Sequence, residues 1–220
     1  MRTETRHPAA PRTGRPIQNS TVPVSPDLVW LATFDSVATV LTPQPLPVTS
    51  PEVLDHIRTL PSRLNRNGAT NLTAAIDAAL QVLANLPRPL GRRLTIIGDG
   101  EANRDQDKLA DRALALRQNW VSARCIDVGN GAGRATLSMI SGLTVGGYYD
   151  VAADYSELAR LIGARKKAQP QRRTCANVVL VDTSWSMSSP FHQDMNRIEA
   201  AQRACAEWVA TMISLYGGRS

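Results

Sequence analysis

Residues 178–190 read VVLVDTSWSMSSP, and this stretch decides the fold that we expect. Its first four residues are apolar and predict a buried strand, and the polar loop that follows carries Asp182, Ser184 and Ser186. The amphipathic residues 196–216 then predict a long helix. A strand, a polar loop and a helix usually open an α/β domain, yet in this sequence the unit comes last.

Strands and helices also alternate in the residues before this unit. The alternation predicts an α/β fold, a doubly wound, mostly parallel six-stranded sheet with helices on both faces. Residues 27–34 and 36–42 read as two short strands joined at Asp35, which predicts one antiparallel edge strand. The other strands are expected at 92–100, 122–129, 147–152 and 176–184, and the helices from Pro51 and at 72–86, 106–120, 135–143, 154–167 and 196–216.

The composition indicates the cellular compartment and the state of the cysteines. No apolar run approaches the roughly 18 residues needed to cross a bilayer, and the first 20 residues carry charge and proline where a signal peptide has an apolar core. We therefore expect a cytoplasmic protein without a membrane partner. The three cysteines, Cys125, Cys175 and Cys205, are odd in number and widely spaced, which favours buried thiols over disulfides or a metal site.

The positive charge is concentrated in two segments. The formal net charge is +6, but residues 1–26 and the run RKKAQPQRR at 165–173 carry so much of it that the remainder is slightly acidic. We expect residues 1–26 to be a disordered basic, proline-rich arm and residues 165–174 to be a basic linker. No aromatic residues stand among these arginines to stack on bases, so we do not expect nucleic acid as a partner.

Three polar loops carry the candidate site. Beside the loop of Asp182, Ser184 and Ser186, the segment NGATNL supplies Thr70 before a helix, and IIGDGEAN supplies Asp99 after a strand. Ligands bind at the carboxyl ends of the strands in such sheets, where these loops converge. All five side chains are hard oxygen donors, which suit Mg²⁺ or Mn²⁺.

Simpler interpretations exist for single residues. Serine and aspartate commonly cap helices, and either Thr70 or Asn71 is a reasonable N-cap for the helix from Leu72. The glycines of Gly129–Gly133 suggest a nucleotide loop, but the spacing lacks the last glycine of the dinucleotide motif. No GxSxG motif provides a nucleophilic serine, so we expect no catalytic residues and no enzyme.

Taken together, the DxSxS loop, the GATNL threonine and the strand ending in GDG resemble a von Willebrand factor A (VWA) domain with a metal-ion-dependent adhesion site (MIDAS). The segment LVWLATFDSVATVL also resembles the family's second and third strands. The resemblance implies that Asp182, Ser184, Ser186, Thr70 and Asp99 bind the metal ion, directly or through water.

The order of the motifs differs from that of the family, whose members begin with the DxSxS strand and its helix. The sequence therefore resembles a circularly permuted VWA domain that spans residues 27–216. Residues 27–164 would supply the family's strands 2–6, and residues 175–216 its first strand and helix. A nine-residue linker can extend about 30 Å, which is enough to join the original ends. A strand-swapped oligomer or a piece of a tandem-domain protein remains an alternative.

The resemblance implies a metal-dependent protein-binding adaptor whose partner completes the coordination with an Asp or Glu carboxylate. Intracellular bacterial relatives often act beside AAA+ ATPases or stress-response proteins, so we expect a partner of that kind. Two alternatives stay open. One is a nucleotide- or metal-dependent enzyme or switch that uses Gly129–Gly133. The other is a metal-free structural module that forms a swapped oligomer.

Overall fold

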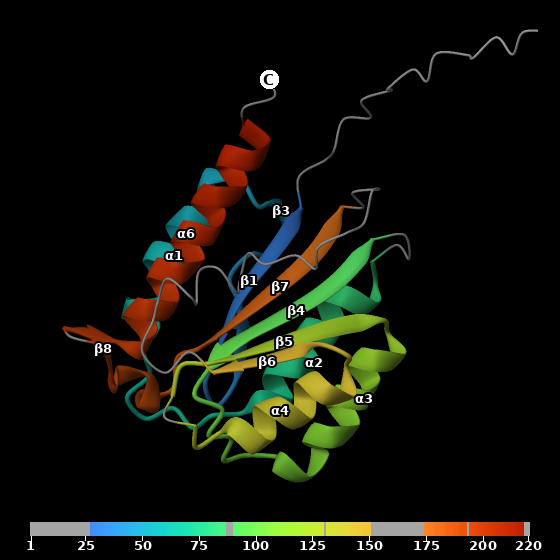
Figure 1. Ribbon diagram of the computed structural model, residues 1–220, viewed down its shortest axis with the longest axis vertical. Coiled ribbons are helices and arrows are strands. Elements are labelled where there is room, and N and C mark those ends of the chain that lie inside the picture. The colour runs from blue at the N-terminus through green and yellow to red at the C-terminus, as the bar shows by residue number, and fades with distance from the viewer. Residues whose placement is uncertain (1–26, 87–89, 130, 151–173, 193, 218–220) are drawn as a thin grey trace, which may run out of the picture.

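The computed structural model describes residues 27–86, 90–129, 131–150, 174–192 and 194–217, and it has an α/β fold (Figure 1). A mostly parallel sheet lies between two layers of helices. The predicted basic arm at 1–26, the predicted helix at 154–167 and all of the predicted linker except Thr174 lie outside the described residues.

The C-terminal strand of the main sheet lies at its centre. The strand order is β2-β1-β7-β4-β5-β6, and β7 pairs in parallel with β1 on one side and with β4 on the other. Strands β5 and β6 continue the parallel part, whereas β2 is antiparallel to β1. The strands in this order have the bounds β1 (Leu28–Phe34), β2 (Ala38–Val40), β4 (Gly91–Gly98), β5 (Val121–Asp127), β6 (Gly147–Asp150) and β7 (Cys175–Asp182).

The predicted count of six strands with one antiparallel strand is wrong. A seventh strand, β3 (Leu46–Pro47), is also antiparallel to β1. It has two residues and contains a proline, so neither alternation nor β propensity marks it in the sequence. A separate small hairpin of β8 (Pro190–His192) and β9 (Met195–Asn196) follows the DxSxS loop and was also not predicted.

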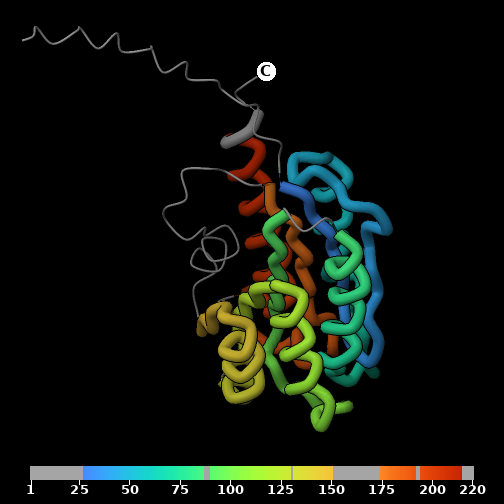
Figure 2. The backbone as a smooth tube through the Cα atoms, turned by 90° about the vertical axis from the view of Figure 1, so that its right-hand side faces the viewer, coloured from blue at the N-terminus to red at the C-terminus, as the bar shows by residue number. Residues whose placement is uncertain are grey.

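Helices cover both faces of the sheet, as predicted. Helices α1 and α6 lie on one face, and α2, α3 and α4 lie on the other (Figure 1, and from the side in Figure 2). Pro51 begins α1, the position that fits its fixed φ angle and missing N–H. The helices are α1 (Pro51–Arg58), α2 (Leu72–Ala84), α3 (Leu109–Gln118), α4 (Arg134–Leu143) and α6 (Arg197–Gly217).

The apolar run in β7 supplies both halves of the core. Val179 and Val181 pack in the cluster under α1 and α6, whereas Val178 and Leu180 pack in the cluster under α2, α3 and α4. Side chains alternate between the two faces of a strand, so a central strand covered on both faces needs apolar residues at every position. Between the buried Asn177 near its start and Asp182 at its end, where the chain enters the DxSxS loop, β7 is entirely apolar.

The cysteines agree with the prediction in two cases of three. Cys125 and Cys205 are buried, whereas Cys175, the first residue of β7, is only half-buried. In the part of the chain that the structure describes, no helix is both long enough and apolar enough to span a bilayer.

Candidate metal centre

Asp182 ends the central strand β7 and lies in the interior with its side chain fully buried. Its Oδ1 accepts a hydrogen bond of 2.8 Å from the backbone N–H of Ser184. Its Oδ2 is one of the few buried polar side-chain atoms, among those described, without a hydrogen-bond partner. An unpartnered carboxylate oxygen in the interior costs free energy, so this atom marks a position where a cation or a donor would be stabilised.

Asp99 lies beside Asp182 because β4 runs next to β7. The last residue of β4 is Gly98, and a Cβ atom there would lie 2.9 Å from the Cβ of Asp182. Only glycine leaves room for the buried carboxylate at that point. Burial first, and then the negative charge of Asp99, raise the pKa of Asp182 to about 7.

The two serines continue the loop after Asp182. The hydroxyls of Ser184 and Ser186 lie 2.9 Å apart and share a hydrogen bond, and a 3-10 turn over Trp185–Ser188 directs the chain back towards the protein. Met187 in this turn is fully buried and anchors it to the core under α6. The loop therefore gathers one carboxylate and two hydroxyls at the end of the central strand.

Thr70 lies on an adjoining loop, which is hydrogen-bonded to Asn103 in the loop that follows Asp99. The N–H of Thr70 donates to the side chain of Asn103 at 3.0 Å, and the N–H of Asn103 donates to the carbonyl of Thr70 at 3.1 Å. Asn71, not Thr70, caps α2, since its Oδ1 accepts from the N–H of Ala74. The capping interpretation thus applies to Asn71 and leaves the buried Thr70 hydroxyl without that role.

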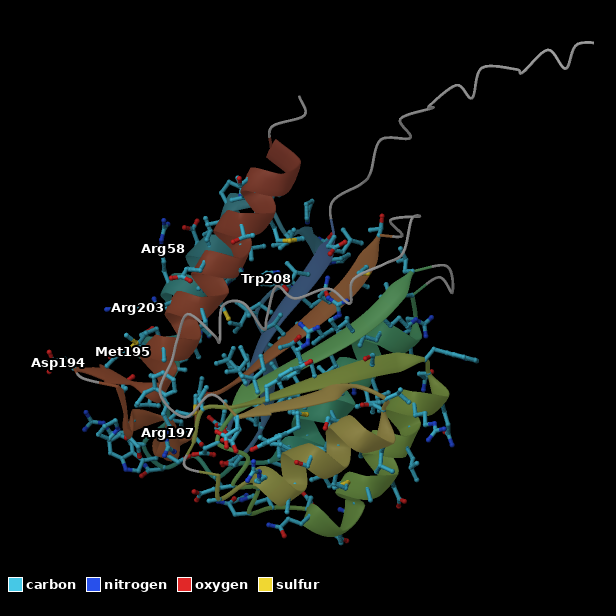
Figure 3. All side chains as sticks on the ribbon, in the orientation of Figure 1. Arg58, Asp194, Met195, Arg197, Arg203 and Trp208 are labelled. Carbon is cyan, nitrogen blue, oxygen red and sulfur yellow. The ribbon has the colours of Figure 1, made fainter. Side chains whose placement is uncertain are left out.

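Arg197 is the residue that sequence reasoning missed. It is the first residue of α6, and its side chain is 10% exposed (labelled in Figure 3). Its Nη1 donates to Oδ2 of Asp99 at 3.0 Å and to the carbonyl of Ser186 at 3.3 Å. A cation is disfavoured at a helix N-terminus by the helix dipole. This position was the one signal in the sequence that Arg197 has a specific partner.

A further buried carboxylate, Asp127, ends the next strand, β5, and was also not predicted. Its two oxygens accept hydrogen bonds from the N–H of Gly129 at 2.8 Å and from the hydroxyl of Tyr148 at 2.9 Å. Burial raises the pKa of Asp127, and the Gly129 and Tyr148 hydrogen bonds oppose that change. Asp127 is therefore satisfied within the protein and differs in this respect from Asp182.

Two of the three glycines suggested as a nucleotide loop, Gly129 and Gly133, have a packing role. A Cβ atom on Gly133 would lie 2.2 Å from the carbonyl oxygen of Asp99, and one on Gly129 would lie 2.8 Å from the Cβ of Asp99. These glycines let the loop after β5 pack against the Asp99 loop. Their presence needs no bound phosphate to explain it.

Trp185 forms an exposed rim beside the buried oxygens. Its side chain is 48% exposed, and the guanidinium of Arg66 lies 5.8 Å from the centroid of its ring. Arg66 belongs to the loop that precedes Thr70, and the same loop is joined to the first residue after β7 by a hydrogen bond from the N–H of Asn65 to the carbonyl of Thr183. Aromatic and arginine side chains so placed are typical of protein-binding surfaces.

The donor set suits a small, hard divalent cation. Asp182, Ser184, Ser186 and Asp99 are brought together at the ends of β7 and β4, and Thr70 lies on the loop bonded to that of Asp99. No cluster of three or more His, Cys, Asp or Glu side chains suited to a metal ion occurs among the described residues, and the predicted donor set does not contain such a cluster, since it has two carboxylates and three hydroxyls. Comparison of the chain with protein-family models and with curated proteins gives no match.

Proposed function

We propose that the protein is a metal-dependent protein-binding module, a circularly permuted VWA domain that binds Mg²⁺ or Mn²⁺ at Asp182, Ser184, Ser186, Thr70 and Asp99. The observation that carries the metal site is the buried, unpartnered Oδ2 of Asp182 beside the hydroxyls of the same loop. A divalent cation would supply positive charge to two neighbouring carboxylates and leave a coordination position for an external ligand.

The strand order supports the permutation. If β7 is counted as the first strand, then β1 and β2 become the second and third, and the sheet order β2-β1-β7-β4-β5-β6 reads 3-2-1-4-5-6. That is the order of the doubly wound sheets whose ligands bind where the order reverses, outside the carboxyl ends of the strands. The reversal here lies between β7 and β4, which end at Asp182 and Gly98. The proposed metal site is thus at the position where this class of sheet binds ligands.

The surroundings of the site favour a protein partner over a reaction. Four of the five proposed ligand residues are buried and Ser186 is half-buried, whereas the rim carries the exposed Trp185 with Arg66 beside it. A partner's Asp or Glu would reach the ion, and Trp185 and Arg66 would contact the residues around that carboxylate. By the resemblance, the partner is a cytoplasmic AAA+ ATPase or a stress-response protein. The protein acts as a monomer or as a strand-swapped oligomer, and in either form a β7 strand fills the place between β1 and β4.

The direct test is thermal unfolding with EDTA and with millimolar Mn²⁺ or Mg²⁺. A ligand that binds only the folded state stabilises it by about 2.7 kcal/mol at one hundred times its Kd. For a domain of this size, that corresponds to a rise in Tm of about 5–10 °C. We expect the wild type to show such a rise and Asp182→Asn to lose it.

Glu101→Gln is the matched control, because Glu101 is an exposed carboxylate on the same loop as Asp99. It should keep the full response to Mn²⁺. The absence of any Mn²⁺ effect on wild-type Tm would overturn the metal site. An equal effect in wild type and Asp182→Asn would show that the ion binds elsewhere.

A further inference from the structure

The proposed metal site already contains a cation that belongs to the protein. The guanidinium of Arg197 contacts Asp99 at 3.0 Å and the carbonyl of Ser186 at 3.3 Å. The guanidinium is therefore in contact with one proposed ligand, the carboxylate of Asp99, and with the backbone of a second ligand residue, Ser186, on a different loop. The side chain of Asp99 is fully buried, so the carboxylate has little water to neutralise it when no other cation is present.

The position of Arg197 shows what the ion pair does for the metal-free protein. A buried cation at the first residue of a helix is opposed both by desolvation and by the helix dipole. Asp99 offsets both effects, and in return Arg197 compensates the charge of Asp99. The pair links the start of α6 to the end of β4 across 98 residues of sequence. Figure 3 shows Arg197 at the end of α6 that lies near the loops.

The contacts of Arg197 are incomplete. Its Nε is buried and has no hydrogen-bond partner among the described residues. A guanidinium has five N–H donors, and a site built only to bind arginine would satisfy them with a two-point carboxylate contact. Here the guanidinium contacts a single oxygen of Asp99. This incomplete pairing favours exchange of the guanidinium for another cation.

The charges lead to competition. Both oxygens of Asp99 already accept hydrogen bonds in the metal-free protein: Oδ2 accepts from Arg197, and Oδ1 accepts from the backbone N–H of Glu101 at 3.2 Å. An ion that bound Oδ2 of Asp99 while Arg197 remained in place would bring two positive groups to the same buried oxygen, where like charges repel each other strongly. The guanidinium and the metal ion therefore compete for the carboxylate of Asp99.

We propose that Arg197 is an internal competitor of the metal ion: it neutralises Asp99 in the metal-free protein, lowers the affinity for the ion, and separates from Asp99 when the ion binds. This inference rests on the proposed function. It makes Arg197 the residue that sets metal affinity, and it couples occupancy of the site to the first turn of α6.

The test is a titration with Mn²⁺ in which free Mn²⁺ is measured by electron paramagnetic resonance. Arg197→Gln removes the competing charge and should lower the Kd for Mn²⁺ by about tenfold or more. Arg203→Gln is the matched control, because Arg203 is exposed on the same helix and its replacement changes the net charge equally (Figure 3). Its Kd should stay within about twofold of the wild type, as expected for a screened surface charge.

A second readout is thermal unfolding of the same variants. In EDTA, Arg197→Gln should melt below the wild type, because Asp99 is left buried without its cation. Saturating Mn²⁺ should close that gap. A variant that folds only when Mn²⁺ is present gives the same support, since the ion has then replaced the guanidinium. Arg197→Met, which fills similar space without charge, repeats both measurements.

The possible results separate this inference from the proposed function. If wild type binds Mn²⁺ and Arg197→Gln binds it no more tightly, competition is refuted while the metal site stands. If neither protein binds, the metal site fails and the inference fails with it. Binding by Arg197→Gln alone would support competition and refute metal dependence of the wild type. Failure of both uncharged variants to fold even with Mn²⁺ would refute replacement of the guanidinium.

Discussion

Replacing Asp182 with asparagine should stabilise the metal-free protein above neutral pH, although Asp182 is part of the proposed site. Burial raises the pKa of Asp182 from 3.8 to about 7 in the folded state. The folded protein therefore keeps a proton on Asp182 over a range in which the unfolded chain has released it. Stability falls as the pH rises through that range and is lowest above about 7, where the buried carboxylate is ionised.

The size of the effect follows from the two pKa values. A tenfold change in an ionisation equilibrium corresponds to about 1.4 kcal/mol. Moving the pKa from 3.8 to about 7 therefore costs the folded wild type about 4 kcal/mol at pH 8, relative to pH below 4. Asparagine does not ionise. It has nearly the same shape as protonated aspartate and also places a hydrogen-bond donor in the interior. The free energies of unfolding of the two proteins should therefore differ mainly through the ionisation of Asp182.

Urea unfolding of both proteins in EDTA, followed by circular dichroism at pH 4 and at pH 8, measures this effect. The variant and the wild type should be similar in stability near pH 4, and the variant should be more stable by about 4 kcal/mol at pH 8. Mn²⁺ at pH 8 should reverse the order, because an ion would stabilise only the ionised aspartate. A difference between the two proteins that is the same at both pH values would refute the reasoning.

Two other predictions concern the packing around the site and the thiols. Gly133→Ala would place its Cβ 2.2 Å from the carbonyl oxygen of Asp99, so urea unfolding should show a loss of about 2 kcal/mol or more, and a loss below about 0.5 kcal/mol would contradict the close approach. Burial raises the pKa of Cys125 and of Cys205 to about 12, so neither thiol should react with a disulfide reagent at pH 8 until urea unfolds the protein. Rapid labelling of either thiol in the native protein would be inconsistent with this burial.

The main elements of the fold could be predicted because their sequence patterns are local. The apolar run of β7 and the amphipathic pattern of α6 predict their structure without knowledge of any other residue. The two-residue strand β3 could not be found in this way. It exists because Leu46 and Pro47 lie against β1, with a hydrogen bond from the N–H of Val48 to the carbonyl of Asp27. Such a strand depends on tertiary contact alone.

The residues of the candidate site also differ in whether local sequence patterns could identify them. Asp182 and Asp99 could be identified because each follows an apolar strand, and parallel strands bring such residues to one edge of the sheet. Arg197 could not be identified as part of the site, because its contact with Asp99 depends on the path of α6 over the sheet. The sequence marks it only as a positive charge at the start of a helix, where the helix dipole disfavours one, and does not say which residue it contacts. Buried ion pairs between distant elements are the feature that pattern analysis misses most readily.

The central position of β7 also has a consequence for synthesis on the ribosome. Strands β1 and β4 are translated long before the strand that lies between them, and the contact between Asn177 and Leu28 spans 149 residues. Until β7 emerges, the nascent chain has two apolar strands with unpaired inner edges, which is a state that invites aggregation and chaperone binding. We therefore expect the nascent protein to resist proteolysis only after residues 175–182 have left the exit tunnel.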